Sequence, residues 1–89
     1  MSEQPKVILD IRGEEEYITG HIPGSKNIGL QELSFALGDV EPDEKILLVC
    51  RTGKRAGQVK LLLEDEGYHN VEVLAGGMEA YKGEIEKGE

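Results

Sequence analysis

The stretch that decides the fold reads Lys45-Ile-Leu-Leu-Val-Cys50-Arg-Thr-Gly-Lys-Arg-Ala56. An apolar run ends in the only cysteine of the chain, and a short loop with a glycine and three cations leads into an amphipathic segment. This order predicts a buried strand, then a thiol at its carboxyl end, then the amino end of a helix. Free amides and the positive end of a helix dipole stabilise an anion at such a point, and they favour a thiolate over a thiol. The stretch therefore predicts a cysteine nucleophile that handles anionic substrates.

The composition of the whole chain limits the class of protein to which this stretch can belong. The 89 residues are 38% hydrophobic and 31% charged, which is typical of one small globular domain. The net charge of −8 argues against nucleic acid and against membranes as partners. Against that acidic background, Arg51, Lys54 and Arg55 form a local positive group.

A single cysteine excludes an internal disulfide and a Cys-x-x-Cys metal site, and it fits a reducing compartment. The first residues show no basic and apolar signal segment, and the apolar runs are far too short to span a membrane. We therefore expect a cytoplasmic protein.

The pattern of apolar and turn residues predicts alternating strands and helices. Strands are expected at residues 7–12, 25–30, 45–49 and 71–74, and helices at 14–19, 31–37, 53–66 and 78–82. In the longest helix, Ala56, Val59, Leu62 and Leu63 are expected to share one buried face. Residues 1–6 and 83–89 are expected to be flexible tails. The alternation predicts an α/β domain over residues 1–89, with a parallel sheet and helices on both faces.

The expected sheet places two polar segments at one edge. Ligands bind such sheets at the carboxyl ends of the strands. Cys50 follows the third strand and Asp10 and Arg12 lie at the end of the first, so we expect both segments to line one crevice if their strands are neighbours. Two interpretations of Arg12 are open: a role in catalysis, or an ion pair with Glu16 that only supports the structure.

Five motifs stand in order along the chain: Asp10-Ile-Arg12 with Glu16-Tyr17, Gly20-His-Ile-Pro-Gly-Ser-Lys-Asn-Ile28, Cys50-Arg-Thr-Gly-Lys-Arg55, Gly67-Tyr-x-Asn-Val71 and Leu74-Ala-Gly-Gly77. Together they resemble the motifs of a rhodanese-like (sulfurtransferase) domain, and the resemblance covers nearly the whole chain. It implies a three-layer fold. That family usually begins with one more strand and helix, so we expect an abbreviated sheet of about four strands.

The resemblance also implies a function and a site. Cys50 would carry sulfur as a persulfide, taken from a donor such as thiosulfate and passed to cyanide or a thiol, without a metal or organic cofactor. The substrate-binding loop would be Arg51, Thr52, Gly53, Lys54, Arg55 and Ala56, with the loop amides around the sulfur. Asp10 and Arg12 are candidates for a supporting role beside it. The expected partners are a small sulfur-donor anion, a thiol or cyanide acceptor and a sulfur-acceptor protein.

The chain shows two further departures from the family pattern, and two alternative functions are open. Ala56 stands where the family often has serine, and Ala80-Tyr81 replaces the usual Ala-Trp, a smaller lid over the site. His21, within its Gly-His-Ile-Pro-Gly turn, is expected to hold that turn rather than to transfer protons. The alternative functions are a cysteine phosphatase or arsenate reductase, and a persulfide carrier or partner-binding module without turnover. The Cys-x4-Arg spacing from Cys50 to Arg55 is one residue shorter than the phosphatase loop, so it favours sulfur over phosphate.

Overall fold

The computed structural model describes residues 7–38 and 40–88, so the tail expected at 1–6 lies outside the described residues. Its elements are β1 (Val7–Asp10), α1 (Glu14–Thr19), β2 (Lys26–Asn27), the 3₁₀ turn η1 (Leu30–Glu32), α2 (Leu33–Ala36), β3 (Ile46–Val49), α3 (Lys54–Asp65), β4 (Val71–Val73) and α4 (Gly77–Ala80). Each predicted strand and helix is present, although the second strand is shorter than expected and the second helix begins as η1.

The described strands form one parallel sheet of four strands in the order β2-β1-β3-β4. β1 lies inside the sheet, where Asp10 is level with Asn27 of β2 on one side and with Val49 of β3 on the other. The carboxyl ends of β1 and β3 are therefore adjacent. This confirms the α/β class and brings the two polar segments of the sequence to one edge of the sheet.

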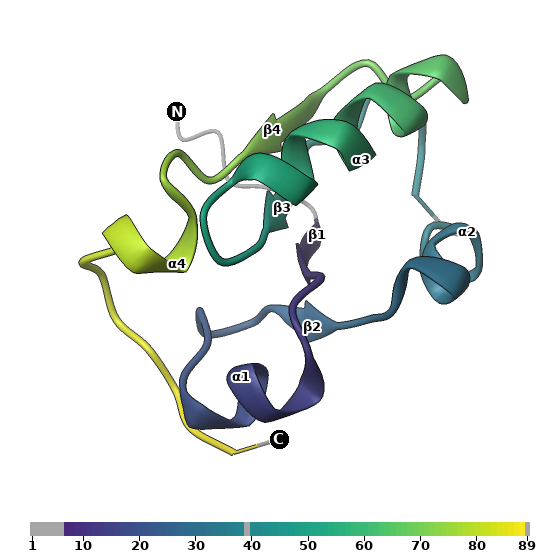
Figure 1. Ribbon diagram of the computed structural model, residues 1–89. Coiled ribbons are helices and arrows are strands. Elements are labelled where there is room, and N and C mark those ends of the chain that lie inside the picture. The colour runs from purple at the N-terminus through teal and green to yellow at the C-terminus, as the bar shows by residue number, and fades with distance from the viewer. Residues whose placement is uncertain (1–6, 39, 89) are drawn as a thin grey trace.

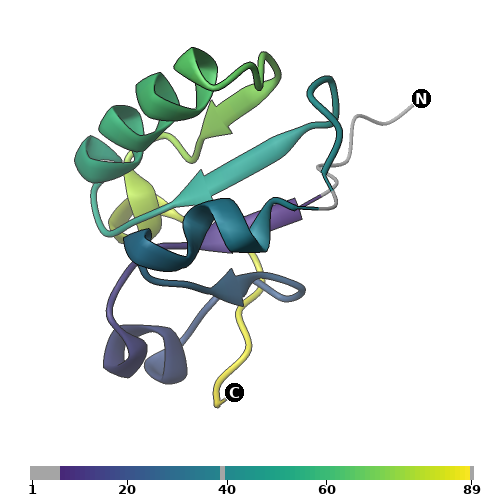
Figure 2. The same ribbon diagram turned by 90° about the vertical axis from the view of Figure 1, so that its right-hand side faces the viewer.

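Helices cover both faces of this sheet, as predicted. α2 and α3 lie on one side, and α1 and α4 lie on the other (Figure 1). The view turned by 90° shows α2 in front of β1 and α3 beside β4 (Figure 2). Right-handed crossovers between parallel strands produce this layering.

The main core lies between the sheet and the α2–α3 layer. Its buried side chains come from three strands and both helices: Leu9, Ile11, Leu33, Leu37, Ile46, Leu48, Cys50, Ala56, Val59, Leu63 and Val71. The prediction that Leu62 shares the buried face is wrong, because its side chain is 62% exposed. Successive helical residues are about 100° apart, so Leu62 lies beyond the arc that Val59 and Leu63 bury.

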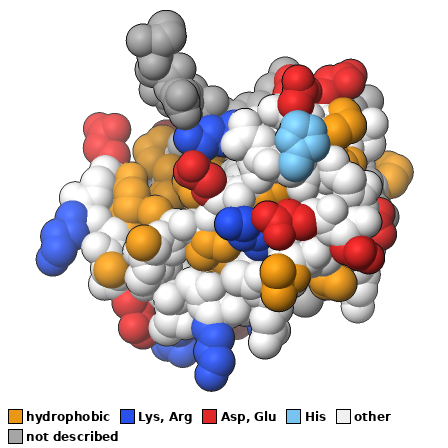
Figure 3. Space-filling view, turned by 90° about the horizontal axis from the view of Figure 1, so that it is seen from above, with side chains coloured by type: hydrophobic (Ala, Val, Ile, Leu, Met, Phe, Trp, Pro, Cys, Tyr) orange, Lys and Arg blue, Asp and Glu red, His pale blue; other side chains and the backbone are white. Residues whose placement is uncertain are grey.

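The outer surface near α3 carries charges of both signs. Seen from above, this face shows both acidic and basic side chains, with hydrophobic groups among them (Figure 3). The face in this view therefore shows no broad patch of one sign, although the whole chain is acidic.

The carboxyl-terminal segment lies against α1 and the turn that follows it. His21 and Glu86 exchange two backbone hydrogen bonds of 2.8 and 2.7 Å, and the Gly88 amide donates to the Ile18 carbonyl at 2.8 Å. The tail that the sequence led us to expect as flexible is thus hydrogen-bonded through its described part. No helix in the described ranges is long and apolar enough to cross a membrane.

Candidate active site

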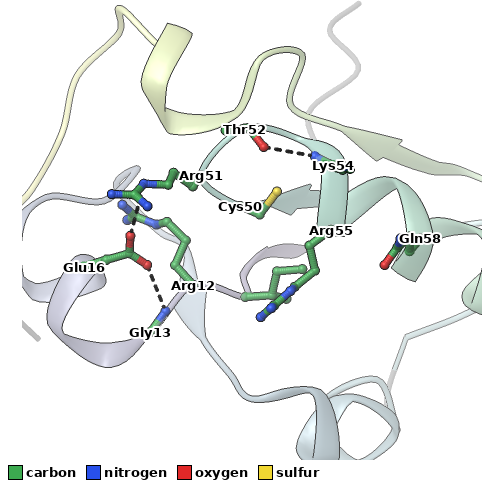
Figure 4. Close-up of a pocket in the computed structure, with 10 residues that line it drawn as sticks. Arg12, Gly13, Glu16, Cys50, Arg51, Thr52, Lys54, Arg55 and Gln58 are labelled. Carbon is green, nitrogen blue, oxygen red and sulfur yellow. Dashed lines mark hydrogen bonds and ion pairs between the residues drawn. The ribbon is translucent and has the colours of Figure 1, made fainter.

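Cys50 lies immediately after β3, at the edge of the sheet where β1 also ends. Cys50 is 5% exposed, and it lines a pocket of about 400 Å³. The lining comes from the end of β1, the start of α1, the loop after β3 and the first turns of α3: Ile11, Arg12, Gly13, Glu16, Cys50, Arg51, Thr52, Lys54, Arg55 and Gln58. The pocket therefore joins the two segments that the sequence placed at one edge (Figure 4).

Two backbone amides reach the sulfur of Cys50. The Gly53 amide donates to Sγ at 2.9 Å and the Ala56 amide at 3.4 Å. Both belong to the amino end of α3, whose first amides have no partner within the helix. Gly53 is the residue before the helix and has φ of 95°, a left-handed conformation that favours glycine. Sγ thus sits where the helix favours negative charge.

The expected ring of amides around the sulfur is smaller than predicted. The Lys54 amide donates to Thr52 Oγ1 at 3.5 Å instead. Among the described residues, the amides that donate a hydrogen bond to Sγ are those of Gly53 and Ala56. The Thr52 hydroxyl therefore supports the loop backbone and faces Lys54 rather than the sulfur, as Figure 4 shows.

The loop is also held from its other side by α4. The Met78 amide donates to the Cys50 carbonyl at 2.9 Å, and the Glu79 amide donates to the Arg51 carbonyl at 3.0 Å. Gly76 and Gly77 precede these amides with φ of 74° and 65°. The Leu74-Ala-Gly-Gly77 motif thus forms a turn that delivers two amides to the loop. Tyr81 is not among the residues that line the pocket; its hydroxyl donates to the Glu84 carbonyl at 3.0 Å.

Arg12 is fixed by Asp10 at the end of β1. Its Nε donates to Asp10 Oδ1 at 2.9 Å and its Nη2 to Oδ2 at 2.7 Å, and Nη2 also donates to the Gly20 carbonyl at 2.7 Å. The Asp10 side chain is fully buried and that of Arg12 is 9% exposed. The hydrogen bond with Asp10 raises the pKa of Arg12 further, although burial opposes this. The predicted ion pair between Arg12 and Glu16 is wrong, because Asp10 is closer and forms both hydrogen bonds of the fork.

Glu16 forms an ion pair with Arg51. Arg51 Nε lies 3.6 Å from Glu16 Oε2 and 3.7 Å from Glu79 Oε2, and the Arg51 side chain is 71% exposed. Glu16 Oε1 also accepts a hydrogen bond from the Gly13 amide at 3.3 Å. Arg51 thus connects α1, the loop and α4 at the rim of the pocket (Figure 4).

Lys54 and Arg55 differ from Arg51 in having no carboxylate partner among the described residues. Both are exposed at the first turn of α3 and both line the pocket. Figure 4 shows Arg55 extending below Cys50, on the side of the loop away from α4. These two cations are therefore free to meet an anion from solution.

Four pocket residues were not among the candidates from the sequence: Ile11, Gly13, Glu16 and Gln58. Glu16 was expected as an ion-pair partner of Arg12, and it instead accepts a hydrogen bond from the Gly13 amide at the start of α1. Gln58 follows Lys54 by one helical turn, so it shares a face with that pocket cation. Helical periodicity from Cys50 onwards could have identified Gln58, whereas the contact of Glu16 with Arg51 depends on tertiary structure.

The two histidines lie outside the pocket lining. His21 is buried, its Nδ1 lies 2.8 Å from the Tyr17 carbonyl, and its ring stacks on Tyr17. This contact supports the expected role in holding the turn. His69 is exposed in the loop before β4. Across the described ranges, no three His, Cys, Asp or Glu residues are grouped closely enough to hold a metal ion.

Comparison with known proteins gives a family match and individual relatives. The model of the rhodanese-like domain family matches residues 1–84. The chain is 29% identical over 85 residues to the putative sulfur carrier protein YrkF of Bacillus subtilis, covering 96% of this chain and 46% of that protein. It is 34% identical over 70 residues to the thiosulfate sulfurtransferase PspE of Escherichia coli, covering 76% of this chain and 67% of that protein. The chain thus spans about half of one relative and two thirds of the other.

A solved structure described as rhodanese with anions, from E. coli, superimposes on this fold with a TM-score of 0.78 at 30% identity. The alignment covers 92% of this chain and 98% of that one.

Proposed function

Because this chain belongs to the rhodanese-like domain family, we propose that it is a sulfurtransferase that carries sulfur on Cys50. The observation that supports this most directly is the position of Sγ. The only thiol of the chain accepts hydrogen bonds from two amides at the amino end of α3. It faces a pocket lined by Lys54 and Arg55, which have no carboxylate partner among the described residues. The activities named for its relatives, sulfur carriage and thiosulfate sulfur transfer, agree with this chemistry.

The proposed reaction has two steps. The Cys50 thiolate attacks the outer sulfur of thiosulfate, and the sulfur–sulfur bond breaks so that sulfite leaves with the electron pair. Cyanide or a thiolate then attacks the outer sulfur of the persulfide, and the returning electron pair restores the Cys50 thiolate. No electrons are gained or lost overall, and the covalent intermediate divides one transfer into two easier displacements.

The loop residues have separate roles in this scheme. The amides of Gly53 and Ala56 stabilise the Cys50 thiolate before loading and the negatively charged persulfide after it, without a rearrangement of the loop. Lys54 and Arg55 bind the anionic donor, and Arg51 contributes less because Glu16 and Glu79 already neutralise it. Asp10 and Arg12 hold the wall opposite the loop. The E. coli relative that was solved with anions is consistent with such binding.

No second cysteine within these 89 residues can receive the sulfur, so the proposed acceptor lies outside them. The proposed acceptors are cyanide in the laboratory, and a small thiol or a sulfur-acceptor protein in the cell. A reducing compartment such as the cytoplasm would keep the lone thiol available.

The test is the intact mass of the protein after exposure to thiosulfate. We expect wild type to gain the mass of one sulfur atom, and a reductant to remove it. Cys50→Ser should fold with an unchanged melting temperature, gain no mass and lose thiosulfate:cyanide transfer almost completely.

Parallel incubations with an aryl phosphate and with a thiol acceptor separate the alternatives. Sulfur loading followed by delivery to the thiol, with negligible phosphate release, is the expected result. Substantial transfer by Cys50→Ser, or phosphate release as fast as sulfur transfer, would overturn the proposal. Loading without delivery to cyanide or the thiol would instead identify a carrier that requires a specific partner.

A further inference from the structure

We propose that Gly77 is a positioning residue for the active-site loop, acting through the backbone amides of Met78 and Glu79. These groups do not touch the pocket. They hold the Cys50–Thr52 backbone from behind, in the conformation that lets Gly53 and Ala56 donate to the sulfur. The effect on turnover rests on the function proposed above, whereas the effect on the thiol does not.

The carbonyls of the active-site loop are fixed in direction by α4. The carbonyls of Cys50 and Arg51 point at α4, where they accept hydrogen bonds from Met78 and Glu79. A peptide bond is planar and trans, so the amide that follows each carbonyl points the opposite way. The Arg51 and Thr52 amides therefore point away from α4, toward the side on which Figure 4 shows the pocket side chains. Without the α4 amides, these peptide units would lose their fixed orientation.

The backbone of the active-site loop and the backbone of the Gly76-Gly77 turn lie very close together. A Cβ added to Gly77 would overlap the carbonyl group of Arg51 and would lie 2.5 Å from the Thr52 nitrogen. A Cβ on Gly53 would face the same turn, 3.4 Å from the Leu74 carbonyl oxygen and 3.7 Å from the Gly77 nitrogen. The loop and the turn thus pack backbone against backbone, and only glycine fits at position 77.

The first experiment measures the rate of Cys50 alkylation by iodoacetamide against pH in Gly77→Ala. We expect the profile to move to higher pH, because a displaced loop aims its amides less well at the sulfur. Alkylation near neutral pH should slow by about tenfold for each unit of that movement. The turnover number of sulfur transfer should fall while the Michaelis constant for thiosulfate changes little, because Lys54 and Arg55 remain on α3.

Gly67→Ala is the matched control. Gly67 also has a left-handed backbone, with φ of 106°, but a Cβ there meets nothing within 4 Å and lies at the far end of α3. It carries the same kind of backbone strain without the overlap. Its alkylation profile should match wild type. An equal movement of both profiles would show that strain alone is responsible and would overturn the proposal.

A second pair of variants decides the matter if Gly77→Ala does not fold. A chain of 89 residues is within reach of chemical synthesis, so single amides can be replaced by esters. The ester at Met78 removes the donor to the Cys50 carbonyl, and the control ester at Tyr81 removes a 3.3 Å hydrogen bond to the Met78 carbonyl, within the α4 turn.

We expect the ester at Met78 to move the alkylation profile and the ester at Tyr81 to leave it in place. Two unmoved profiles, or two equal shifts, would contradict a specific role for the contact with the loop. If wild type took sulfur from no donor, the proposed function would fail, but this comparison of alkylation profiles would still stand.

Discussion

Arg12 and Arg51 line the same pocket but are held in opposite ways. Arg12 is 9% exposed and makes a two-pronged contact with a fully buried carboxylate. Arg51 is 71% exposed and lies 3.6–3.7 Å from two surface carboxylates. A buried ion pair becomes costly when one partner is removed, whereas an exposed pair contributes little. Position beside the nucleophile therefore does not reveal which cation serves the structure and which serves the chemistry.

The largest expected effect comes from breaking the buried pair. Asp10→Asn should lower the free energy of unfolding by about 3 kcal/mol, because it leaves the Arg12 guanidinium buried without its carboxylate. Arg12→Lys keeps the charge but loses the fork, so we expect a lower melting temperature and near-normal activity per folded molecule. Denaturant unfolding and activity at matched folded fraction measure the two quantities. Normal stability with collapsed turnover in Arg12→Lys would move Arg12 from the structural group to the catalytic one.

Arg12 should not itself make stability depend on pH in the neutral range. Its pKa in the folded state is raised above the unfolded value, chiefly by the hydrogen bond with Asp10. A cation of this kind stabilises the fold fully below its unfolded pKa and loses the effect only as pH rises through the folded pKa. For an arginine both values are strongly alkaline. Arg12→Lys and wild type should therefore differ by a constant free energy of unfolding from pH 6 to pH 8, roughly the neutral range, and a difference that grows across it would contradict this.

An intermediate effect is expected from the unpaired cations. Lys54→Ala and Arg55→Ala should each raise the Michaelis constant for thiosulfate, by up to about tenfold, or about 1.4 kcal/mol, and weaken its dependence on salt. Lys60→Ala is the control, because Lys60 lies on the same helix but pairs with Glu64 at 3.9 Å and does not line the pocket. Melting temperatures should hardly change. Equal effects from Lys60→Ala would mean that overall charge, not position, attracts the donor.

The smallest effect is expected at the rim. Arg51→Ala should change the Michaelis constant by no more than about threefold, because an exposed ion pair contributes roughly 0–1 kcal/mol. Glu16→Gln should lower the same constant slightly, since it removes a negative charge from the pocket wall and frees Arg51. Thiosulfate kinetics at low and high salt distinguish these changes. A tenfold rise in the Michaelis constant of Arg51→Ala would show that the donor displaces Glu16 and Glu79 from Arg51.

These contrasts also mark what the sequence could predict. The apolar run before Cys50 and the glycine loop after it predicted β3, the start of α3 and the nucleophile, because they depend on neighbours along the chain. The partner of Arg12 was predicted wrongly, because Glu16 has a suitable spacing but belongs to a helix that turns it toward Arg51. Asp10, two residues away at the end of β1, accepts hydrogen bonds from both the Arg12 amide and its guanidinium instead.

The role of α4 illustrates the same limit. Gly76-Gly77 predicted a turn and a helix start, and both are present. Their contact with the Cys50 loop could not be inferred, because it joins segments that meet only when β4 pairs with β3. In the same way, the apolar pattern of α3 predicted that Leu62 would be buried. The packing of α3 on the sheet buries a narrower part of the helix surface, which leaves Leu62 outside it.

The contact between α4 and the loop also has a consequence for synthesis of the protein in the cell. The ribosome adds Cys50 well before it adds Met78 and Glu79, whose amides donate hydrogen bonds to the Cys50 and Arg51 carbonyls. Small domains fold as units once their elements have been made. In a nascent chain, the Cys50 loop therefore lacks its contacts with α4 until translation has passed Glu79. The full reactivity of the thiol should arise only then.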